Sequence, residues 1–135
     1  MTTMASLQGL GGFVLYFGAS LLAAAAYVLI YMAVTPHREA KLIKAGNAAA
    51  AVSLGGALLG FTLPLASAVV NSVSLLDMAI WSVVALVAQL GAFQLASLLL
   101  RGLSRRIEDG DLAAGFAVAA ISVAVGILNA ASMTY

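Results

Sequence analysis

The stretch GLGGFVLYFGASLLAAAAYVLIYMAV, from Gly9 to Val34, contains no Lys, Arg, Asp, Glu or His. At 1.5 Å per residue, such a helix is long enough to cross a hydrocarbon core about 30 Å thick. Three further apolar runs follow it: Asn47–Val70, Asp77–Leu100 and Asp111–Ser132. The runs are continuous rather than alternating, which excludes a β-barrel. We therefore predict an all-α membrane protein with four transmembrane helices, forming a single domain over residues 1–135.

The bulk composition agrees with a membrane protein. Hydrophobic residues make up 64% of the chain and charged residues only 8%, whereas soluble domains carry about 25% charged residues. The net charge of +1 is too balanced for a nucleic-acid binder. The lipid bilayer is therefore the first partner that the composition predicts.

The basic residues predict the orientation of the helices. All six Lys and Arg side chains lie in two connections, one between the first and second runs and one between the third and fourth. They are Arg38, Lys41 and Lys44, then Arg101, Arg105 and Arg106. Because cytoplasmic loops are rich in Lys and Arg, both connections are predicted to be cytoplasmic. We therefore expect both termini on the outer side, in the periplasm, with the protein in a bacterial inner membrane.

The two halves of the chain resemble each other. A shift of 64 residues, from Asn47 to Asp111, aligns Ile43–Ala50 with Ile107–Ala114, and four of these eight positions are identical. We therefore predict two tandem helical hairpins, over about 9–71 and 74–134, as a parallel repeat about an axis along the membrane normal. Asn47 and Asp111 each follow a glycine-containing turn and are predicted to cap the helix that begins after them.

Small residues at helical spacing predict close helix packing. Gly56 and Gly60 lie in the second run, and Ser122, Gly126 and Ala130 lie in the fourth. Such residues let backbones approach closely in lipid, inside one bundle, between subunits or around a narrow pore. We expect these faces to remain available to neighbouring copies, and so predict a homo-oligomer in which Gly60→Leu disturbs assembly before insertion.

A few polar residues fall within or beside the membrane runs. Gln89 and Asn129 are predicted to donate or accept hydrogen bonds between helices, and a polar track for water or ions is the alternative. Ser74 is predicted to cap the third helix together with Asp77. Pro64 is expected to remove one backbone hydrogen bond and to kink the second helix.

The residues offer little for catalysis. The chain has no Cys and a single His, His37, so disulfides and thiolate chemistry are excluded and a multi-His metal site would need several subunits. Thr35 and Pro36 are expected to open a short helical turn, and His37 is expected to be exposed to solvent. No nucleophile with a base and an orienting group is evident, so we predict neither an enzyme, nor a cofactor, nor a metal site.

Nearly the whole chain resembles the YjfL-like family of small bacterial inner-membrane proteins, domain of unknown function 350. The motifs that carry this resemblance are Thr35-Pro36-His37, Glu39, Leu42-Ile43-Lys44, Asn47, Ala49-Ala50, Leu58-Leu59-Gly60, Pro64-Leu65, Ser67-Ala68, Asn71-Ser72-Val73-Ser74, Asp77, Ala113-Ala114-Gly115, Asn129-Ala130-Ala131 and Met133-Thr134. The resemblance implies a two-helix unit that is often present twice. It also implies an association with membrane-coating proteins of phage-shock type and with proteins of glutathionylspermidine-synthase type, and it supplies no reaction.

These observations lead to two functional hypotheses. The first is a non-enzymatic inner-membrane protein that anchors or assists a cytosolic membrane-stress protein. The alternative is an oligomeric channel or transporter for a small solute or ion. A pore needs polar side chains or free carbonyls on a shared axis, whereas an anchor needs packed helices and exposed loops.

Overall fold

A computed structural model describes residues 3–133 of the chain. It contains four long helices and two short ones: α1 (Thr3–Val34), α2 (Glu39–Lys44), α3 (Ala48–Asn71), α4 (Leu75–Leu99), α5 (Leu103–Glu108) and α6 (Leu112–Ser132). The four long helices have the length and composition of membrane spans, which confirms the predicted class and number of spans. The first helix is longer than predicted, because it begins at Thr3 rather than near Gly9. Thr134, part of the predicted second hairpin, lies outside the described residues.

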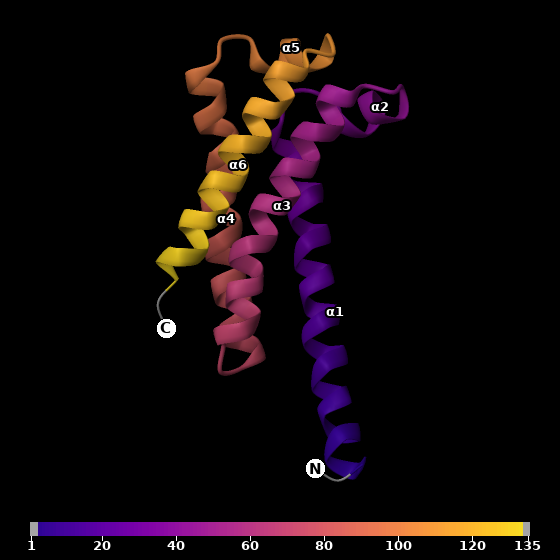
Figure 1. The fold of residues 1–135 in the computed structure, drawn as a ribbon, viewed down its shortest axis with the longest axis vertical. Helices are drawn as coiled ribbons and strands as arrows, with labels where there is room; N and C mark the ends of the chain where they lie inside the picture. Colours follow the sequence, from indigo (N-terminus) through magenta and orange to yellow (C-terminus); the bar gives the residue numbers. More distant parts are fainter. Residues whose placement is uncertain (1–2, 134–135) are drawn as a thin grey trace.

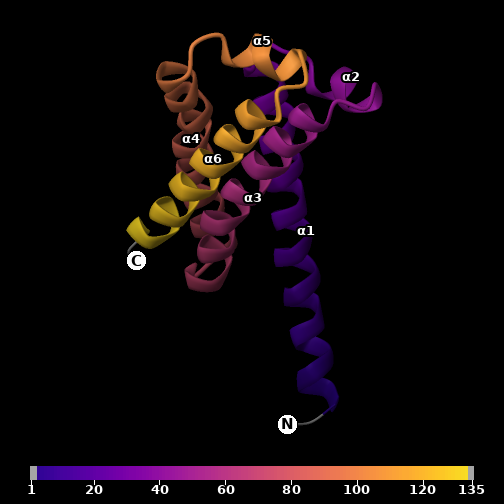
Figure 2. The ribbon, with the colours of Figure 1, turned by 45° about the horizontal axis from the view of Figure 1, so that its top comes forward.

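Helices α3, α4 and α6 form a bundle, and α1 diverges from it. The most extensive contact is between α3 and α6, and α4 packs against both of them. The two short helices lie together at one end of the bundle, while α1 runs beside α3 at this end and then diverges (Figure 1). Turning the molecule leaves the outer part of α1 separate from the other helices (Figure 2).

The connections leading into α3 and α6 are built in the same way. Gly46 has a φ of 87° and Gly110 a φ of 81°, in the left-handed region that glycine enters at little cost. In the first turn, Gly46 N donates to Ile43 O and Asn47 N donates to Leu42 O. In the second, Gly110 N donates to Ile107 O and Asp111 N to Arg106 O. Both turns therefore end their short helix with the same paired bonds, a Schellman motif.

Side-chain caps begin the three later membrane helices. Asn47 Oδ1 accepts a hydrogen bond from Ala50 N at 3.0 Å, and Asp111 Oδ1 accepts one from Ala113 N at 3.0 Å. At α4, Ser74 Oγ accepts from Asp77 N and Asp77 Oδ2 accepts from Val73 N, each at 3.1 Å. The predicted cap of Ser74 with Asp77 is thus confirmed. Such caps satisfy backbone N–H groups at the ends of the spans, where lipid offers no partner.

Glycine lets α3 and α6 cross at backbone contact. A Cβ atom on Gly115 would lie 2.6 Å from the carbonyl oxygen of Ala49. Likewise, a Cβ on Gly56 would meet Ala119, and one on Gly126 would meet the backbone of Gly60. The expectation that these faces remain available to neighbouring copies is therefore wrong, because within one chain they already contact each other.

Aromatic side chains hold α1 against the bundle. The Tyr27 ring stacks on Phe61 of α3, with centroids 4.5 Å apart and planes 7° from parallel. The Tyr31 ring meets Phe93 of α4 edge-on, with centroids 6.0 Å apart. These two tyrosines are the buried residues of α1 within Thr3–Val34. Most of the remaining surface of α1 is therefore not covered by the other helices.

Candidate functional site: the basic end and the polar core

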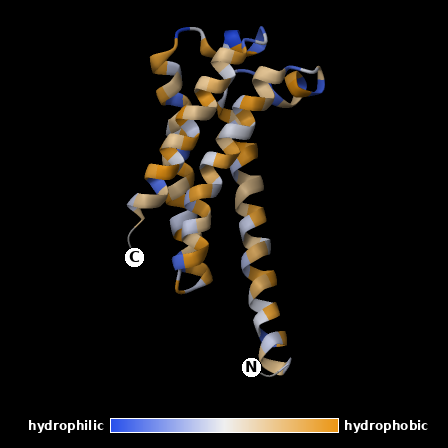
Figure 3. Ribbon diagram, viewed as in Figure 1, coloured by the Kyte–Doolittle hydropathy of each residue, from blue (hydrophilic) through white to orange (hydrophobic). Residues whose placement is uncertain are grey.

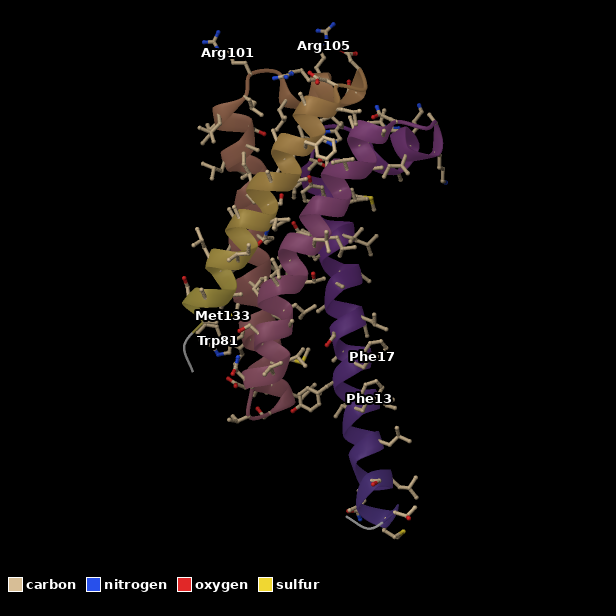
Figure 4. The ribbon with its side chains drawn as sticks, in the orientation of Figure 1. Phe13, Phe17, Trp81, Arg101, Arg105 and Met133 are labelled. Atoms are coloured by element: carbon tan, nitrogen blue, oxygen red, sulfur yellow. The ribbon has the colours of Figure 1, made fainter. Side chains whose placement is uncertain are left out.

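The end of the bundle that carries α2 and α5 holds all six Lys and Arg side chains together with Glu39, Glu108, Asp109 and Asp111, and we call it the basic end. Arg38, Lys41, Lys44, Arg101 and Arg105 are all exposed there. Figure 3 shows hydrophilic residues gathered at this end, and Figure 4 shows Arg101 and Arg105 pointing away from the bundle. The fold therefore brings both basic connections onto one surface, although they are far apart in sequence.

Arg106 differs from the other five basic residues because it has a carboxylate partner. Its Nε donates to Asp111 Oδ2 at 2.8 Å. The Arg106 hydrogen bond holds the pKa of Asp111 below its ordinary value. Asp111 thus caps α6 with one oxygen and binds Arg106 with the other, and Arg106 is less free than the others to bind a ligand.

Beneath the basic end lies a polar cluster formed by Thr35, His37, Glu39 and Ser104. Thr35 Oγ1 donates to the Glu39 carboxylate, 2.9 Å from each oxygen. His37 Nδ1 lies 3.1 Å from Ser104 Oγ of α5. His37 Nε2 is 3.1 Å from Glu39 Oε1, but the ring N–H is not aligned as a hydrogen bond to that oxygen. This contact is therefore a close electrostatic one.

The polar cluster corrects two expectations. His37 was expected to be exposed, yet its exposure is 1%, as is that of Glu39. The short helix α2 begins at Glu39, with Arg38 rather than Thr35 at its N-cap position. The burial of His37 involves α5, whose Ser104 contacts the ring from more than sixty residues away in the chain. The sequence pattern near His37 does not indicate a contact with α5.

Within the membrane spans, the amide side chains bond neighbouring helices. The fully buried Gln89 of α4 donates through Nε2 to the carbonyl oxygen of Ser122 at 2.5 Å. Asn129 of α6 donates to the carbonyl oxygen of Ala85 at 3.2 Å. Gln89 Oε1 and Ser122 Oγ are buried without a hydrogen-bond partner. Ser122 is itself buried, and Ala130, the last of the predicted packing residues, is half-buried.

The α3–α6 pair carries an open apolar groove on its surface. The groove encloses about 530 Å³ and is lined by Val52, Gly55, Gly56, Leu59, Phe116, Ala119, Ala120 and Val123. Each lining residue of α3 corresponds to one of α6 after a shift of 64 positions: 52 with 116, 55 with 119, 56 with 120 and 59 with 123. Both halves of the chain therefore line this groove with equivalent positions.

Another apolar cavity separates α1 from α4 where the two helices diverge. It encloses about 340 Å³, and its walls include Ala19 and Ala23 of α1 and Met78 and Val83 of α4. Among residues 3–133, no three His, Asp or Glu side chains are grouped as a metal site would require. The features whose polar side chains could bind a ligand or a proton are thus the basic end, the polar cluster and the buried amides.

Four apolar spans, helix caps at their ends and a basic end define a multi-pass α-helical membrane protein. The family model described as Domain of Unknown Function (DUF350) matches residues 4–133, so the chain belongs to this family. It is 40% identical over 129 residues to the UPF0719 inner membrane protein YjfL of Escherichia coli strain K12, covering 96% of this chain and 98% of that protein. The YjfL protein of Escherichia coli O157:H7 matches equally well. No solved structure matches the chain.

The comparisons agree with the predicted family and with a multi-pass protein of the inner membrane. The relatives are described only as inner membrane proteins. The family description likewise gives no activity. A role for this chain must therefore be argued from its own geometry.

Proposed function

We propose that this protein is a non-enzymatic inner-membrane anchor or accessory that presents its basic end to a cytosolic membrane-stress protein. The observation that carries the proposal is the exposure of Arg38, Lys41, Lys44, Arg101 and Arg105 on one surface. Each such charge contributes about 1 kcal/mol next to an anionic lipid surface. The two short helices hold these charges at the membrane boundary, where a membrane-coating protein would also lie.

The packing of the bundle supports an anchor. The crossing of α3 and α6 is closed by backbone contact at Gly56, Gly115 and Gly126. The amides of Gln89 and Asn129 donate to carbonyl oxygens of neighbouring helices. The small faces that were considered as a pore lining therefore serve packing within one chain.

The proposed orientation places the basic end in the cytoplasm and both termini in the periplasm. The support is the positive-inside rule applied to six basic residues on one end. Because the chain has no Cys, single cysteines report each site without background. Thr3→Cys should react with an impermeant maleimide in intact cells, and Ala40→Cys should react only after the cells are opened. Labelling of Ala40→Cys in intact cells would reverse the orientation.

We also propose that the chain is a tandem repeat of two hairpins, about 9–71 and 74–134. The support is the equivalence of the turns before α3 and α6, with Gly46 and Gly110 in the same conformation. A direct test is to express the two hairpins as separate chains. Co-purification of a folded pair would support two units, and failure of either half to insert without the other would contradict them.

The partner proposal is tested by site-specific crosslinking in living cells. A photoreactive residue at Lys41 or Arg105, both exposed at the basic end, should capture a cytosolic membrane-coating protein. The same residue at Leu7, exposed near the other end of α1, is the matched control and should capture none. Crosslinks only to lipid or to integral proteins would contradict the anchor hypothesis.

The alternative is an oligomeric channel or transporter for a small solute or ion. The observation that favours it is the presence of buried polar atoms without partners, among them Gln89 Oε1 and Ser122 Oγ near the middle of the spans. Purified protein in liposomes distinguishes the two functions. Selective flux that Gln89→Leu abolishes, while the fold survives, would replace the anchor by the channel.

We further propose a homo-oligomer that uses the open groove between α3 and α6 rather than the residues buried at their crossing. Equivalent positions of both halves line this groove, and Gly55 at its edge has no neighbouring atom within 4 Å. Gly55→Leu should therefore leave one chain folded and weaken association of copies. Gly91→Leu, at an equally open glycine of α4, is the control. A monomeric wild-type protein in nanodiscs would contradict this proposal.

A further inference from the structure

The polar cluster holds two ionisable side chains away from solvent at the junction of the two halves. The side chains of His37 and Glu39 both have 0% exposure. A buried charge is costly unless a neighbouring group compensates it. We propose that His37 and Glu39 form a buried proton-binding site, and that its occupancy determines whether α5 stays docked on the first half of the chain.

Among the described residues, His37 is the basic side chain within salt-bridge distance of the Glu39 carboxylate. The hydroxyl of Thr35 donates a hydrogen bond to the Glu39 carboxylate. The nearby basic residues Arg38, Lys41 and Lys44 are exposed, and Arg106 is paired with Asp111. The number of protons bound by His37 and Glu39 together therefore decides the net charge of the cluster.

The remaining neighbours of the pair come from every element packed around it. On α1, Tyr31 interacts electrostatically with Glu39 and lies 3.4 Å from Ser53 of α3 through its hydroxyl. On α4, the Phe93 ring lies 5.7 Å from the His37 ring. On α5, Ser104 contributes a neutral hydroxyl. Tyr31 is thus the other titratable group at this site, and it too carries no positive charge.

His37 also connects the first half to α5. Its Nδ1 contacts Ser104 Oγ, and the buried side chains of Leu103 and Ile107 hold the underside of α5 against the bundle. Lifting α5 would break the His37–Ser104 contact and expose Leu103 and Ile107. The protonation of the pair and the docking of α5 are therefore coupled through one contact surface.

The charge balance gives the direction of the pH dependence. With one proton shared, the pair is neutral, either as imidazolium and carboxylate or as imidazole and carboxylic acid. Loss of that proton leaves a buried carboxylate without compensation, and gain of a second leaves a buried imidazolium without compensation. Each is unfavourable where both side chains have 0% exposure. Docking of α5 is therefore strongest at intermediate pH and weaker on both sides.

A cysteine under α5 measures the docking. Leu103 is 3% exposed, so Leu103→Cys should react with a maleimide only when α5 lifts. Asp109→Cys, at an exposed position, corrects for the pH dependence of the thiol itself. The ratio of the two labelling rates in proteoliposomes should be lowest at intermediate pH and rise severalfold on both the acid and the alkaline side.

Two sets of variants assign the effect to the pair. In the Glu39→Gln background, which retains only the imidazole, the ratio should rise on the acid side alone. In the His37→Gln/Glu39→Gln background, which has no ionisable pair, it should be flat. Ser104→Ala should raise the ratio at every pH and keep its shape, because it removes the contact but not the charges.

The same measurements can overturn the proposal. A ratio that is flat in the parent protein contradicts it, and so does a pH dependence that persists in the double variant. Circular dichroism at each pH checks that the spans remain helical. If the double variant fails to fold, the shape of the Glu39→Gln curve decides, since a two-sided rise there contradicts a shared proton.

Discussion

Helices α1 and α4 each precede a short helix in the chain, but their side chains are buried to very different extents. In α4, the buried side chains run from Met78 through Gln89 to Ala96, along nearly the whole helix. In α1, they are confined to Tyr27 and Tyr31. After a shift of 64 positions, these tyrosines correspond to Gly91 and Leu95 of α4, which are exposed. Both helices are strongly apolar, so hydropathy did not decide which one entered the core.

The difference shows what builds a core in lipid. Apolar surface gains little from leaving one apolar environment for another, so packing and hydrogen bonds decide the contacts. α4 has a buried amide, Gln89, which donates to the carbonyl oxygen of Ser122 on α6 and lies against Gly60 of α3. α1 has Ala25 at the position 64 residues before Gln89, and its fully buried contacts with the bundle are the aromatic ones of Tyr27 and Tyr31.

The largest expected effect comes from overfilling the core where α3 meets α4 and α6. In Gly60→Leu, the new Cβ atom would overlap the carbonyl of Ser122 and the amide of Gln89. We expect the free energy of unfolding to fall by about 3 kcal/mol or more. Gly18→Leu on α1, where nothing lies within 4 Å, should be neutral. Equilibrium unfolding in bicelles measures both, and equal losses would contradict the division into core and outlying helix.

The next effect concerns the attachment of α1. Tyr27→Ala removes the ring stacked on Phe61, and we expect a loss of about 2 kcal/mol, because lipid replaces only part of the packing. Phe17→Ala, at a side chain that is 53% exposed, should change the stability by less than about 0.5 kcal/mol. Spin labels on α1 and α4 should also report a wider separation in Tyr27→Ala. An unchanged separation would show that other contacts hold α1.

A smaller effect is expected from the buried amide of α4. Gln89→Leu removes the hydrogen bond to Ser122 and should cost about 0.5–1 kcal/mol. Gln94→Leu, at an exposed position of the same helix, provides the control and should cost less. If both substitutions have the same effect, the Gln89 contact does not distinguish α4 from α1.

The smallest expected effect is a difference in how the residues that cap α3 and α6, Asn47 and Asp111, affect the pH dependence of stability. Arg106 lowers the pKa of Asp111 in the folded protein, so the carboxylate contributes stability above its ordinary pKa, and this contribution is lost as the pH falls through the lowered value. Asp111→Asn should remove that acid-side loss. Asn47 is already neutral, so Asn47→Ser should leave the pH dependence unchanged. Thermal unfolding between about pH 3 and pH 7 measures the difference.

Sequence predicted those parts of the fold that depend on local patterns. Long apolar runs predicted the four spans, and the sequence around Ser74 and Asp77 predicted a cap that the structure confirms. Asn47 and Asp111, chosen as caps, accept hydrogen bonds from the first turns of α3 and α6. In each case the interacting groups lie within a few residues, so spacing alone carries the information.

The errors concern groups whose environment is set by distant parts of the chain. His37 and Glu39 look like an exposed loop until α5 covers them, through a contact with Ser104. Gly60 and Gly126 form a small-residue pattern that predicts close packing, but the pattern does not name the partner helix. In the structure, Gly126 faces the backbone of Gly60, and Gly60 faces Ser122 and Gln89.

The length of α1 has a mechanical consequence. Its 32 residues extend to about 48 Å, whereas the hydrocarbon core is about 30 Å thick. A rigid apolar rod of that length has to lean, or its end has to leave the hydrocarbon region, and the lean changes with bilayer thickness. The fully buried side chains of α1 within Thr3–Val34, Tyr27 and Tyr31, both lie in its half near the basic end, so a change in tilt is expected to displace the opposite end of the helix most.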